Sequence, residues 1–562
     1  ACKVVSKIVT DLLSNVLKFD TGTDDTEGGI GMEPQNGFSS GRGTSDGTFL
    51  AVESLRLRME HSQDTFVLLL DLVKAFPSVP RSGMMIILSK FGIPPHLCKV
   101  ILSLHTDVTA HFKMGKAEVE MPNTSGTKQG DPLAAILFLY VMQAALETLE
   151  PSMEHLEFKT VVDEDEVLKR EEKKAFSSFR IGSKWRTKKG STTFSLWCSL
   201  YADDAANFFS TRSKLQAGCA FIYKHLKRFG LTMHVGRGDK ASKSEAMFCP
   251  GHGSSYEDGD TSKMIITDDG GFIEFTKSFK YLGSIITPDL ASTADVAQRI
   301  KKASKVFGAL RRDIFANRSV TLKAKKALYT SFVLSTLLFG SESWCLLKKD
   351  ELKLERFHRS CVRAMAGVSK YKQWRRRLSS VQLERRLGLY SLGHYLQVRA
   401  LRWLGHLARM PQERLPRKLL FGWVDHPKPV GCPRMSYGRR MAGVVKRALA
   451  KAAPGVQRLV EGHATRNGPG GIGWYRLAQN RQMWRRLVHA GSGDGRALPA
   501  SPSRRRPPQQ QQPLQLHENT CYNFISTHPW VGPTPWWHQG WWWNKGAALH
   551  DRRPPYLEKQ WR

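Results

Sequence analysis

Several features that would narrow the function are missing from this sequence of 562 residues. Its nine cysteines are scattered, odd in number and include no CxxC pair, which argues against a disulfide framework and a zinc ribbon and fits a reducing compartment. No uninterrupted apolar run reaches the roughly 18 residues that a membrane helix needs, so we expect no membrane. The first residues lack an initiating Met and the apolar core of a signal peptide. We therefore expect the sequence to begin inside a longer protein, and no targeting follows from its start.

Acidic residues are scarce beside basic ones. The sequence has 85 Lys and Arg against 50 Asp and Glu, a formal net charge of +35 at pH 7. Residues 351–500 alone carry 31 Lys and Arg against 7 Asp and Glu, a net charge of +24. A solvated basic face explains short charge runs, but an excess over so long a segment indicates a polyanionic partner, and nucleic acid fits best.

The pattern of apolar residues predicts an alternating α/β unit followed by a mainly helical second half, in two to four domains. The predicted helices are 1–18, 49–59, 82–90, 133–149, 213–229, 292–313, 321–339 and most of 351–450. The predicted strands are 65–70, 194–200, 205–209 and a short one near 247, with a hairpin at 106–121. The charged stretch 150–193 is expected to be an irregular surface insertion, and the low-complexity end after Gly491 is expected to be disordered.

Two of the predicted strands end in aspartate: one at Asp71, the other at Asp203 and Asp204, 132 residues after Asp71. Adjacent carboxylates repel each other unless a cation lies between them. Mg²⁺ takes one or two protein carboxylates, and two such ions about 4 Å apart can activate a hydroxyl and stabilise a leaving pyrophosphate. An Asp-Asp turn alone is a weak signal, since a solvent-exposed hairpin explains it better.

Five strings in order add to this signal: Asp71-Leu-Val-Lys-Ala-Phe76, Gly126-Thr-Lys-Gln-Gly-Asp-Pro-Leu133, Tyr201-Ala-Asp-Asp204, Lys243-Ser-Glu-Ala-Met247 and Phe279-Lys-Tyr-Leu-Gly283. They resemble successive palm motifs of reverse transcriptases. Three further segments, Gln35-Asn-Gly-Phe38 with Gly41-Arg-Gly-Thr44, 335–344 and 401–410, resemble the non-LTR (LINE-type) retrotransposon enzymes. The resemblance covers about residues 1–435 and is to an N-terminally truncated fragment of such an enzyme.

The resemblance implies an α/β (α+β) right-hand polymerase fold. It comprises a palm with an RRM-like antiparallel sheet plus helices, partial fingers, a helical thumb and a basic helical C-terminal region. The implied division is 1–64 partial fingers, 65–265 palm with finger elements and the insertion 150–193, 266–350 primer grip and thumb, 351–490 nucleic-acid-binding region, and 491–562 disordered tail. The implied partners are an RNA template, a DNA primer or target DNA, and dNTPs, in the nucleus and cytoplasm; the oligomeric state is left open.

Residue roles also follow from the resemblance. Two Mg²⁺ ions, replaceable by Mn²⁺, are implied to bind Asp71, the backbone carbonyl of Leu72, Asp203 and, more peripherally, Asp204. Lys243 is implied to protonate the leaving pyrophosphate, although Lys240 competes for this role. A surface lysine explains Lys243 almost as well.

Further residues are implied to bind substrate. Phe76 would select deoxynucleotides by a clash with a ribose 2′-hydroxyl, and its alternative is a core aromatic. Gln129 and Gly130 would contact nucleotide and template, and their alternative is a helix-capping turn. The remaining implied contacts are Arg42 and Tyr201 for substrate, and Tyr281, Leu282 and Gly283 for the primer end, where a simple hairpin is the alternative.

The sequence departs from the family pattern in three ways. The finger strands that hold the triphosphate are expected before residue 1 and are absent, Pro77 stands in place of an Asp, and His234 stands in place of an Asn. The competing hypothesis is therefore an inactive remnant that only binds nucleic acid. A group II intron or retron enzyme is disfavoured by Gly41-Arg-Gly-Thr44 and by Trp403-Leu-Gly-His406.

Overall fold

The computed structural model describes residues 2–17, 31–161 except 116 and 129, and 191–427. In the C-terminal part it describes 429, 437–452, 454, 456–457 and 473–489. The predicted disordered tail therefore lies outside the described residues, as does most of the charged insertion. The description below concerns the described ranges.

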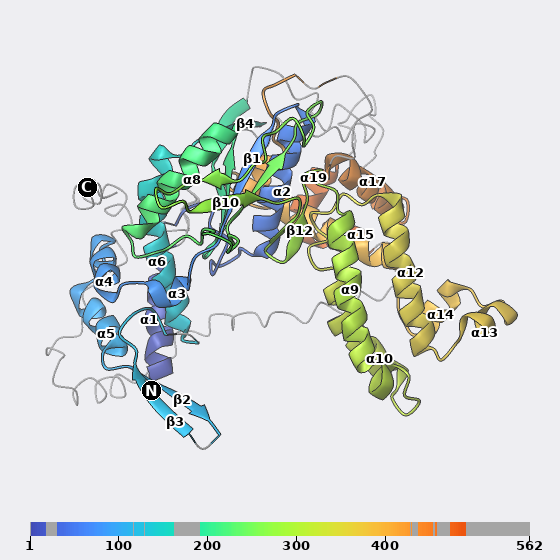
Figure 1. Cartoon of the computed structure of the whole chain (residues 1–562). Helices are drawn as coiled ribbons and strands as arrows, with labels where there is room; N and C mark the ends of the chain where they lie inside the picture. The colour runs from blue at the N-terminus through green and yellow to red at the C-terminus, as the bar shows by residue number, and fades with distance from the viewer. Residues whose placement is uncertain are drawn as a thin grey trace.

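A six-stranded sheet forms the centre of the protein, in the order β6-β7-β1-β8-β10-β9 (Figure 1). Its strands are β1 (Thr65–Leu70), β6 (Cys198–Tyr201), β7 (Asp204–Phe209), β8 (Glu245–Cys249), β9 (Met264–Ile265) and β10 (Phe272–Phe275). Neighbouring strands are antiparallel except for β8 and β10. The four strands β6-β7-β1-β8 thus have the antiparallel order expected of a split β-α-β unit.

The sheet is covered on both faces, which explains why β1 has no polar alternation. Phe66, Leu68 and Leu70 belong to one hydrophobic core, and Val67 and Leu69 belong to another. Successive side chains of a strand point to opposite faces, so a strand buried on both sides needs an unbroken apolar run. All six residues of β1 are buried, and the predicted strand is confirmed at its predicted bounds.

The helices of the first face come from the N-terminal half. They are α1 (Cys2–Val16), α3 (Ala75–Ser78), α4 (Arg81–Lys90), α5 (Pro95–His105), α6 (Pro132–Leu149) and α8 (Arg212–Lys227). The core helix α6 begins at Pro132, and the Asp131 side chain accepts the Leu133 N–H at its start. Together with its short continuation to Ser152, α6 is long and apolar enough to cross a membrane, judged by length and composition only. However, 78% of its most apolar 18-residue stretch is buried inside the protein.

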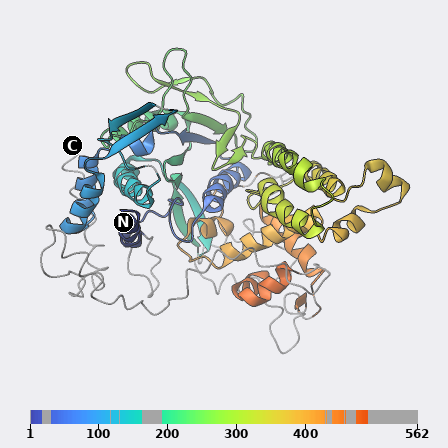
Figure 2. The same cartoon turned by 90° about the horizontal axis from the view of Figure 1, so that it is seen from below.

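The helices of the second face join the two ends of the described chain. They are α2 (Thr44–Glu60), α15 (Leu392–Ala408), α16 (Leu415–Leu420), α17 (Tyr437–Leu449), α19 (Gly473–Gln479) and α20 (Arg481–Val488). Their side chains share one core with β1, β7 and β8. Figure 2 shows the orange C-terminal helices beside α2. Helix α2 begins five residues before the predicted helix start at Phe49.

Three hairpins lie outside the central sheet: β2–β3 (Thr109–Met114, Ala117–Pro122), β4–β5 (Leu156–Val161, Ser191–Leu196) and β11–β12 (Phe279–Tyr281, Ser284–Ile286). The first confirms the predicted hairpin. The second corrects two predictions. The insertion begins with a regular strand, and the single strand predicted over 194–200 is two strands in different sheets, because β5 pairs with β4 and β6 pairs with β7.

The remaining helices project from this body (Figure 1). They are α9 (Thr293–Leu310), α10 (Leu322–Leu328), α11 (Ser335–Leu337), α12 (Lys348–Met365), α13 (Lys370–Arg375) and α14 (Ser380–Arg386), with π-helical turns at Arg311–Phe315 and Tyr329–Leu334. A single hydrophobic core runs from Val296 to Leu396. Helices on both sides of residue 350 therefore pack together.

Candidate active site

The three predicted acidic residues meet at one edge of the central sheet. Asp71 directly follows β1, whose last residue, Leu70, pairs with Ala205. Tyr201 pairs with Asp204, so Ala202 and Asp203 form the two-residue turn between β6 and β7. Because β1 and β7 are neighbours, the end of one strand lies beside the start of the other, and residues far apart in the sequence come together.

The carboxylates are close enough to disturb one another. Burial raises the pKa of Asp203, and the nearby Asp71 carboxylate raises it further. Desolvation, then Asp203 and Asp71, raise the pKa of Asp204 to about 6, while the positive charge of Lys280 acts in the opposite direction. Lys280 is an exposed residue of β11 that sequence reasoning did not single out. The edge of the sheet thus concentrates negative charge that a cation would offset.

The donor set suits a hard cation, because carboxylate and carbonyl oxygens are the ligands that Mg²⁺ takes. The residues described contain no group of three or more His, Cys, Asp or Glu side chains already arranged as a metal centre. Leu72 pairs with Met233 in an isolated bridge, whose hydrogen bonds use the Asp71 carbonyl and the Val73 N–H. The Leu72 carbonyl does not take part in that pair of bonds.

Two residues hold the backbone of Asp71. The His234 N–H donates to the Asp71 carbonyl over 2.8 Å. The Ser244 hydroxyl accepts the Asp71 N–H over 3.1 Å and lies 3.3 Å from the Asp71 carbonyl, to which it can donate. His234 also accepts the backbone N–H of Lys243 at Nδ1, over 3.1 Å. The unusual His234 therefore links the fourth motif to the first, while the Lys243 side chain is exposed.

A segment upstream supports the turn that carries Asp203. The Gln35 side-chain oxygen accepts the N–H of Ala202 over 2.9 Å and that of Gly37 over 2.8 Å. Ala202 has φ of +59°, a left-handed conformation that costs a non-glycine residue about 1–2 kcal/mol. A Cβ at Gly37 would lie 2.5 Å from the Ala202 nitrogen. Only glycine permits this approach.

The sequence predicted Gln35 only as part of the partial fingers, and it did not predict a contact with the turn that carries Asp203. The sequence signal that could have indicated this contact is a Gln followed two residues later by a Gly. The Gln side chain accepts a nearby backbone N–H, and the Gly allows another backbone segment to approach closely. The backbone adds to the contact. Asn36 N–H donates to the Leu200 carbonyl, and Leu200 N–H donates to the Pro34 carbonyl.

The predicted substrate-binding residues differ in how far their side chains are buried and in what they contact. Phe76 is half-buried and stacks on Phe138 at 4.5 Å between ring centroids. Gly130 is exposed, with φ of +84° and nothing within 4 Å of an added Cβ. Gln129 lies outside the described residues. The Tyr201 ring is half-buried, 6.5 Å from that of Phe38.

Arg42 is used inside its own loop. Its guanidinium donates to the backbone carbonyls of Glu33 and Gln35. Burial lowers the pKa of Arg42 to about 10, against the effect of the Glu33 carboxylate. A contact with substrate would have to form from a guanidinium that already holds the Gln35 backbone, so this role stays a prediction.

Pro77, the second departure, is packed against Gly126, the first glycine of the second string. Gly126 has φ of +73°, and a Cβ there would lie 2.5 Å from the Pro77 Cα. The Gly126 N–H donates to the Val79 carbonyl, and the Thr127 N–H donates to the Phe76 carbonyl. The missing N–H of proline therefore leaves this contact between the two motifs intact.

The predicted primer grip is the turn of the β11–β12 hairpin, which contacts β6. Leu282 and Gly283 both have positive φ, +46° and +88°, as a tight two-residue hairpin requires. The Tyr281 side chain is buried, and its hydroxyl donates to the Ser199 carbonyl over 2.9 Å. Tyr281 therefore anchors the hairpin to β6, and of the three predicted primer-grip residues Leu282 and Gly283 are half-exposed.

Comparison with known proteins identifies the family. The family model for reverse transcriptase (RNA-dependent DNA polymerase) matches residues 1–286. A curated relative, the retrovirus-related Pol polyprotein from the type-1 retrotransposable element R2 of Bradysia coprophila, is 34% identical over 103 residues. That alignment covers 18% of this chain and 11% of the relative, so the chain spans a small part of the polyprotein's length. The chain belongs to the reverse transcriptase family.

Proposed function

We propose that this chain is an RNA-directed DNA polymerase of a non-LTR retrotransposon. The observation that carries the proposal is the meeting of Asp71, Asp203 and Asp204 at one edge of the sheet, where burial and the neighbouring carboxylates raise the pKa of Asp203 and Asp204. Carboxylates brought together in this way bind divalent cations, and a polymerase needs two. The relative's retrotransposable element agrees with the proposal.

In the proposed reaction the primer 3′-hydroxyl attacks the α-phosphate of a dNTP, and pyrophosphate leaves. Bound Mg²⁺ would activate the hydroxyl and offset the charge of the phosphates. Asp71, Asp203 and the Leu72 carbonyl are the proposed ligands, and the exposed Asp204 is the more peripheral one. Phe76 would exclude a ribose 2′-hydroxyl. The exposed Lys243 would donate a proton to the leaving pyrophosphate.

The proposed division into regions follows the family. Residues 65–265 would be the palm, 1–64 partial fingers, 266–350 primer grip and thumb, and 351–490 a nucleic-acid-binding region that holds the RNA template and DNA primer. Because α9 and α12 share one core, the boundary at 350 would separate functions and not folding units. The six cysteines at positions 98, 198, 219, 249, 345 and 361 are free. The nucleus or the cytoplasm is the proposed location.

Primer extension on poly(rA)/oligo(dT) with Mg²⁺ or Mn²⁺ tests this proposal. We expect wild-type extension and a loss of at least about 10³-fold in Asp203→Ala, because removing a metal ligand abolishes the charge stabilisation. The matched control is Asp268→Ala, an exposed aspartate away from the three acids, which should extend like wild type. Wild-type extension no greater than that of Asp203→Ala would reject the enzyme hypothesis.

The alternative is a protein that binds nucleic acid without polymerising. The charge of residues 351–500 favours this second candidate independently of the acids. It predicts RNA binding that weakens steeply with salt, equal in wild type and Asp203→Ala, and no extension by either. Binding that survives deletion of 351–500 would remove its basis.

A further inference from the structure

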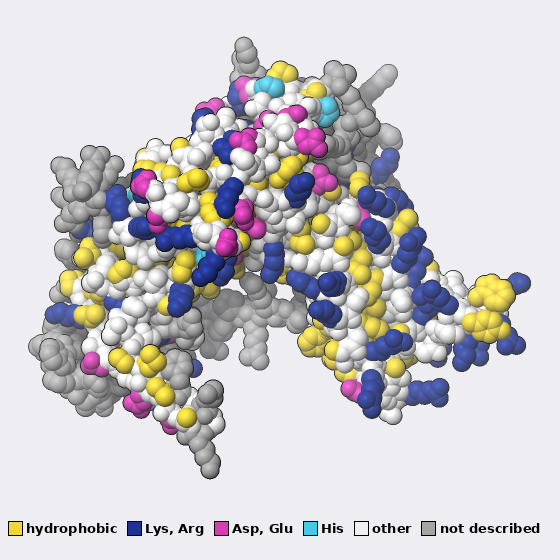
Figure 3. Space-filling model, viewed as in Figure 1, with side chains coloured by type: hydrophobic (Ala, Val, Ile, Leu, Met, Phe, Trp, Pro, Cys, Tyr) yellow, Lys and Arg dark blue, Asp and Glu magenta, His cyan; other side chains and the backbone are white. Residues whose placement is uncertain are grey.

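The outer end of the projecting helices carries an exposed aromatic pair. Tyr371 and Trp374 lie on α13, with 63% and 77% of their surface exposed. Their ring centroids are 6.3 Å apart. Figure 3 shows a hydrophobic patch at this end of the protein with Lys and Arg around it. Large exposed aromatics are uncommon on a surface without a partner and indicate a binding site.

The surface next to Trp374 is hollowed and basic. A pocket of about 720 Å³ is lined by Trp374 and by four cationic side chains, those of Arg363, Lys370, Arg375 and Arg377. Gln373 and Leu378 complete its lining. Residues 356–383 contain eight Lys and Arg and no Asp or Glu. Within the described part of the chain, no carboxylate pairs with the four cations that line the pocket. Such a hollow has the size of a small-ligand site, roughly 300–1,000 Å³, and a charge that attracts phosphate.

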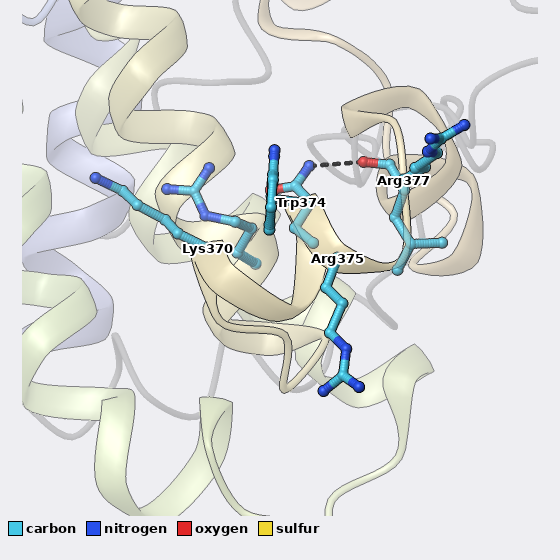
Figure 4. Close-up of a pocket in the computed structure, with 7 residues that line it drawn as sticks. Lys370, Trp374, Arg375 and Arg377 are labelled. Carbon is cyan, nitrogen blue, oxygen red and sulfur yellow. Dashed lines mark hydrogen bonds between the residues drawn. The ribbon is translucent and has the colours of Figure 1, made fainter.

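The backbone holds Trp374 in this position. Ser369 caps α13 by accepting the Lys372 N–H, and Gln373 donates from its side chain to the Leu378 carbonyl over 3.1 Å (Figure 4). The partly buried Leu378 packs against the core of α9–α12. Because these contacts order the backbone that carries Trp374, binding costs little backbone entropy.

The cations surround the aromatic side chain in more than one direction. Figure 4 shows Lys370 and Arg377 on either side of Trp374, with Arg375 extending below. Single-stranded nucleic acid needs this combination, since its bases stack on aromatic rings while its phosphates follow nearby cations. A duplex would offer phosphates only, because its bases are already stacked on one another. An uncharged peptide would not account for the cations.

We propose that Tyr371, Trp374 and the cations of this pocket form a site for unpaired nucleotides, in which a base stacks on Trp374. The proposal rests on the proposed function, since a polymerase on an RNA template meets single strands outside its duplex. Besides the attraction of the basic region for phosphates, this site would give the protein a specific preference for unpaired bases. The nucleic-acid contact would lie at the tip of the helices, far in the fold from the three acids.

Fluorescence anisotropy of labelled oligonucleotides with the full chain tests the site. The probes are a 20-nucleotide single-stranded RNA, the matching single-stranded DNA and the RNA in a duplex. We expect Trp374→Ala to weaken binding of the single strands about 10-fold and of the duplex less than twofold. RNA weakened alone, or DNA weakened alone, identifies which strand the site takes. Trp374→Phe should recover most of the affinity, because Phe also stacks.

Two controls separate stacking from folding and from charge. Val381→Ala removes an exposed aliphatic side chain of α14 outside the pocket and should bind like wild type. Lys370→Gln should lower the slope of affinity against salt, whereas Trp374→Ala should leave that slope unchanged. Asp268→Ala, at an exposed position away from the three acids, should bind all three probes like wild type. The anisotropy measurement requires no primer extension, so a failed polymerase assay leaves the binding result interpretable.

The opposite results would overturn the site. Wild-type affinity of Trp374→Ala for both single strands would exclude stacking, and an equal loss on single strand and duplex would show a charge effect alone. Loss of a protein partner with unchanged oligonucleotide binding would assign the patch to protein docking and refute the proposal. If Trp374→Phe bound as weakly as Trp374→Ala, a stacking role would also be excluded.

Discussion

Replacing Gln35 by Met removes one oxygen atom that binds the turn carrying Asp203, and leaves all three aspartates unchanged. That oxygen accepts two backbone N–H groups, of Gly37 and Ala202, in a side chain that is 8% exposed. An unpaired buried donor costs about 1–3 kcal/mol, and water can reach part of a turn, so we expect a loss of about 2–4 kcal/mol in unfolding free energy. Methionine has a similar volume and no comparable acceptor.

The effect on catalysis should exceed the effect on folding. Ala202 holds its left-handed φ of +59° partly through this bond, and Asp203 follows it directly. A misplacement of about 1 Å at a reacting group costs roughly 10²-fold in rate. We therefore expect kcat for primer extension to fall about 10- to 100-fold in Gln35→Met, with a smaller change in KM for dNTP.

The assay is steady-state primer extension alongside thermal unfolding. Gln143→Met is the matched control, because Gln143 is also buried and accepts a backbone N–H, from Met32, but lies on α6 away from the turn. It should lower the unfolding temperature without a specific loss of kcat. A Gln35→Met protein that unfolds earlier but extends primers at the wild-type rate would refute the link between Gln35 and the catalytic turn.

Three further outcomes are expected. Phe76→Val should raise incorporation of ribonucleotides relative to deoxynucleotides at least about 10-fold, because the smaller side chain would no longer meet a 2′-hydroxyl. The measurement is the ratio of the two kcat/KM values, and an unchanged ratio would mean that Phe76 is only a core aromatic. Gly126→Ala should destabilise by about 2 kcal/mol or more, seen in urea unfolding, since its Cβ would meet Pro77, whereas Gly130→Ala, with positive φ but open space, should cost about 1 kcal/mol. Burial lowers the pKa of His358 to about 4, so between pH 6.5 and 4 the unfolded chain takes up a proton at this residue that the folded chain does not. The contribution of His358 to the unfolding free energy should therefore fall by about 3 kcal/mol as the pH drops through this window, measured as the difference between wild type and His358→Gln because His394 titrates there too. A difference that does not change with pH would contradict that assignment.

The elements that the sequence predicted well are those whose signal is local. The run of β1 is apolar throughout because both faces are covered, and α6 starts at a proline after a capping Asp131, so both were predicted close to their observed bounds. The predicted strand over 194–200 failed for a non-local reason. Its two halves pair with β4 and β7, and strand pairing depends on partners that periodicity does not reveal.

The site shows the same division. The sequence could indicate Asp71 and Asp203 because carboxylates at strand ends have recognisable chemistry. It could not indicate Ser244 or His234, whose contribution is a hydrogen bond to the Asp71 backbone across 173 and 163 positions. Gln35 was visible as part of a motif, but its contact with Ala202 exists only once β6 and the upstream segment are folded together.

The shared core of the second face has a consequence for how this protein can be divided. The family model ends at residue 286, yet Val67 and Leu69 on one face of the central sheet belong to a core with helices that continue to Val488. A chain cut where the similarity stops would leave that face of the sheet uncovered, and exposed apolar surface of this kind promotes aggregation. Substitutions on the buried side of the C-terminal helices are therefore constrained by the sheet that these helices cover, and the two parts of the chain have to fold together.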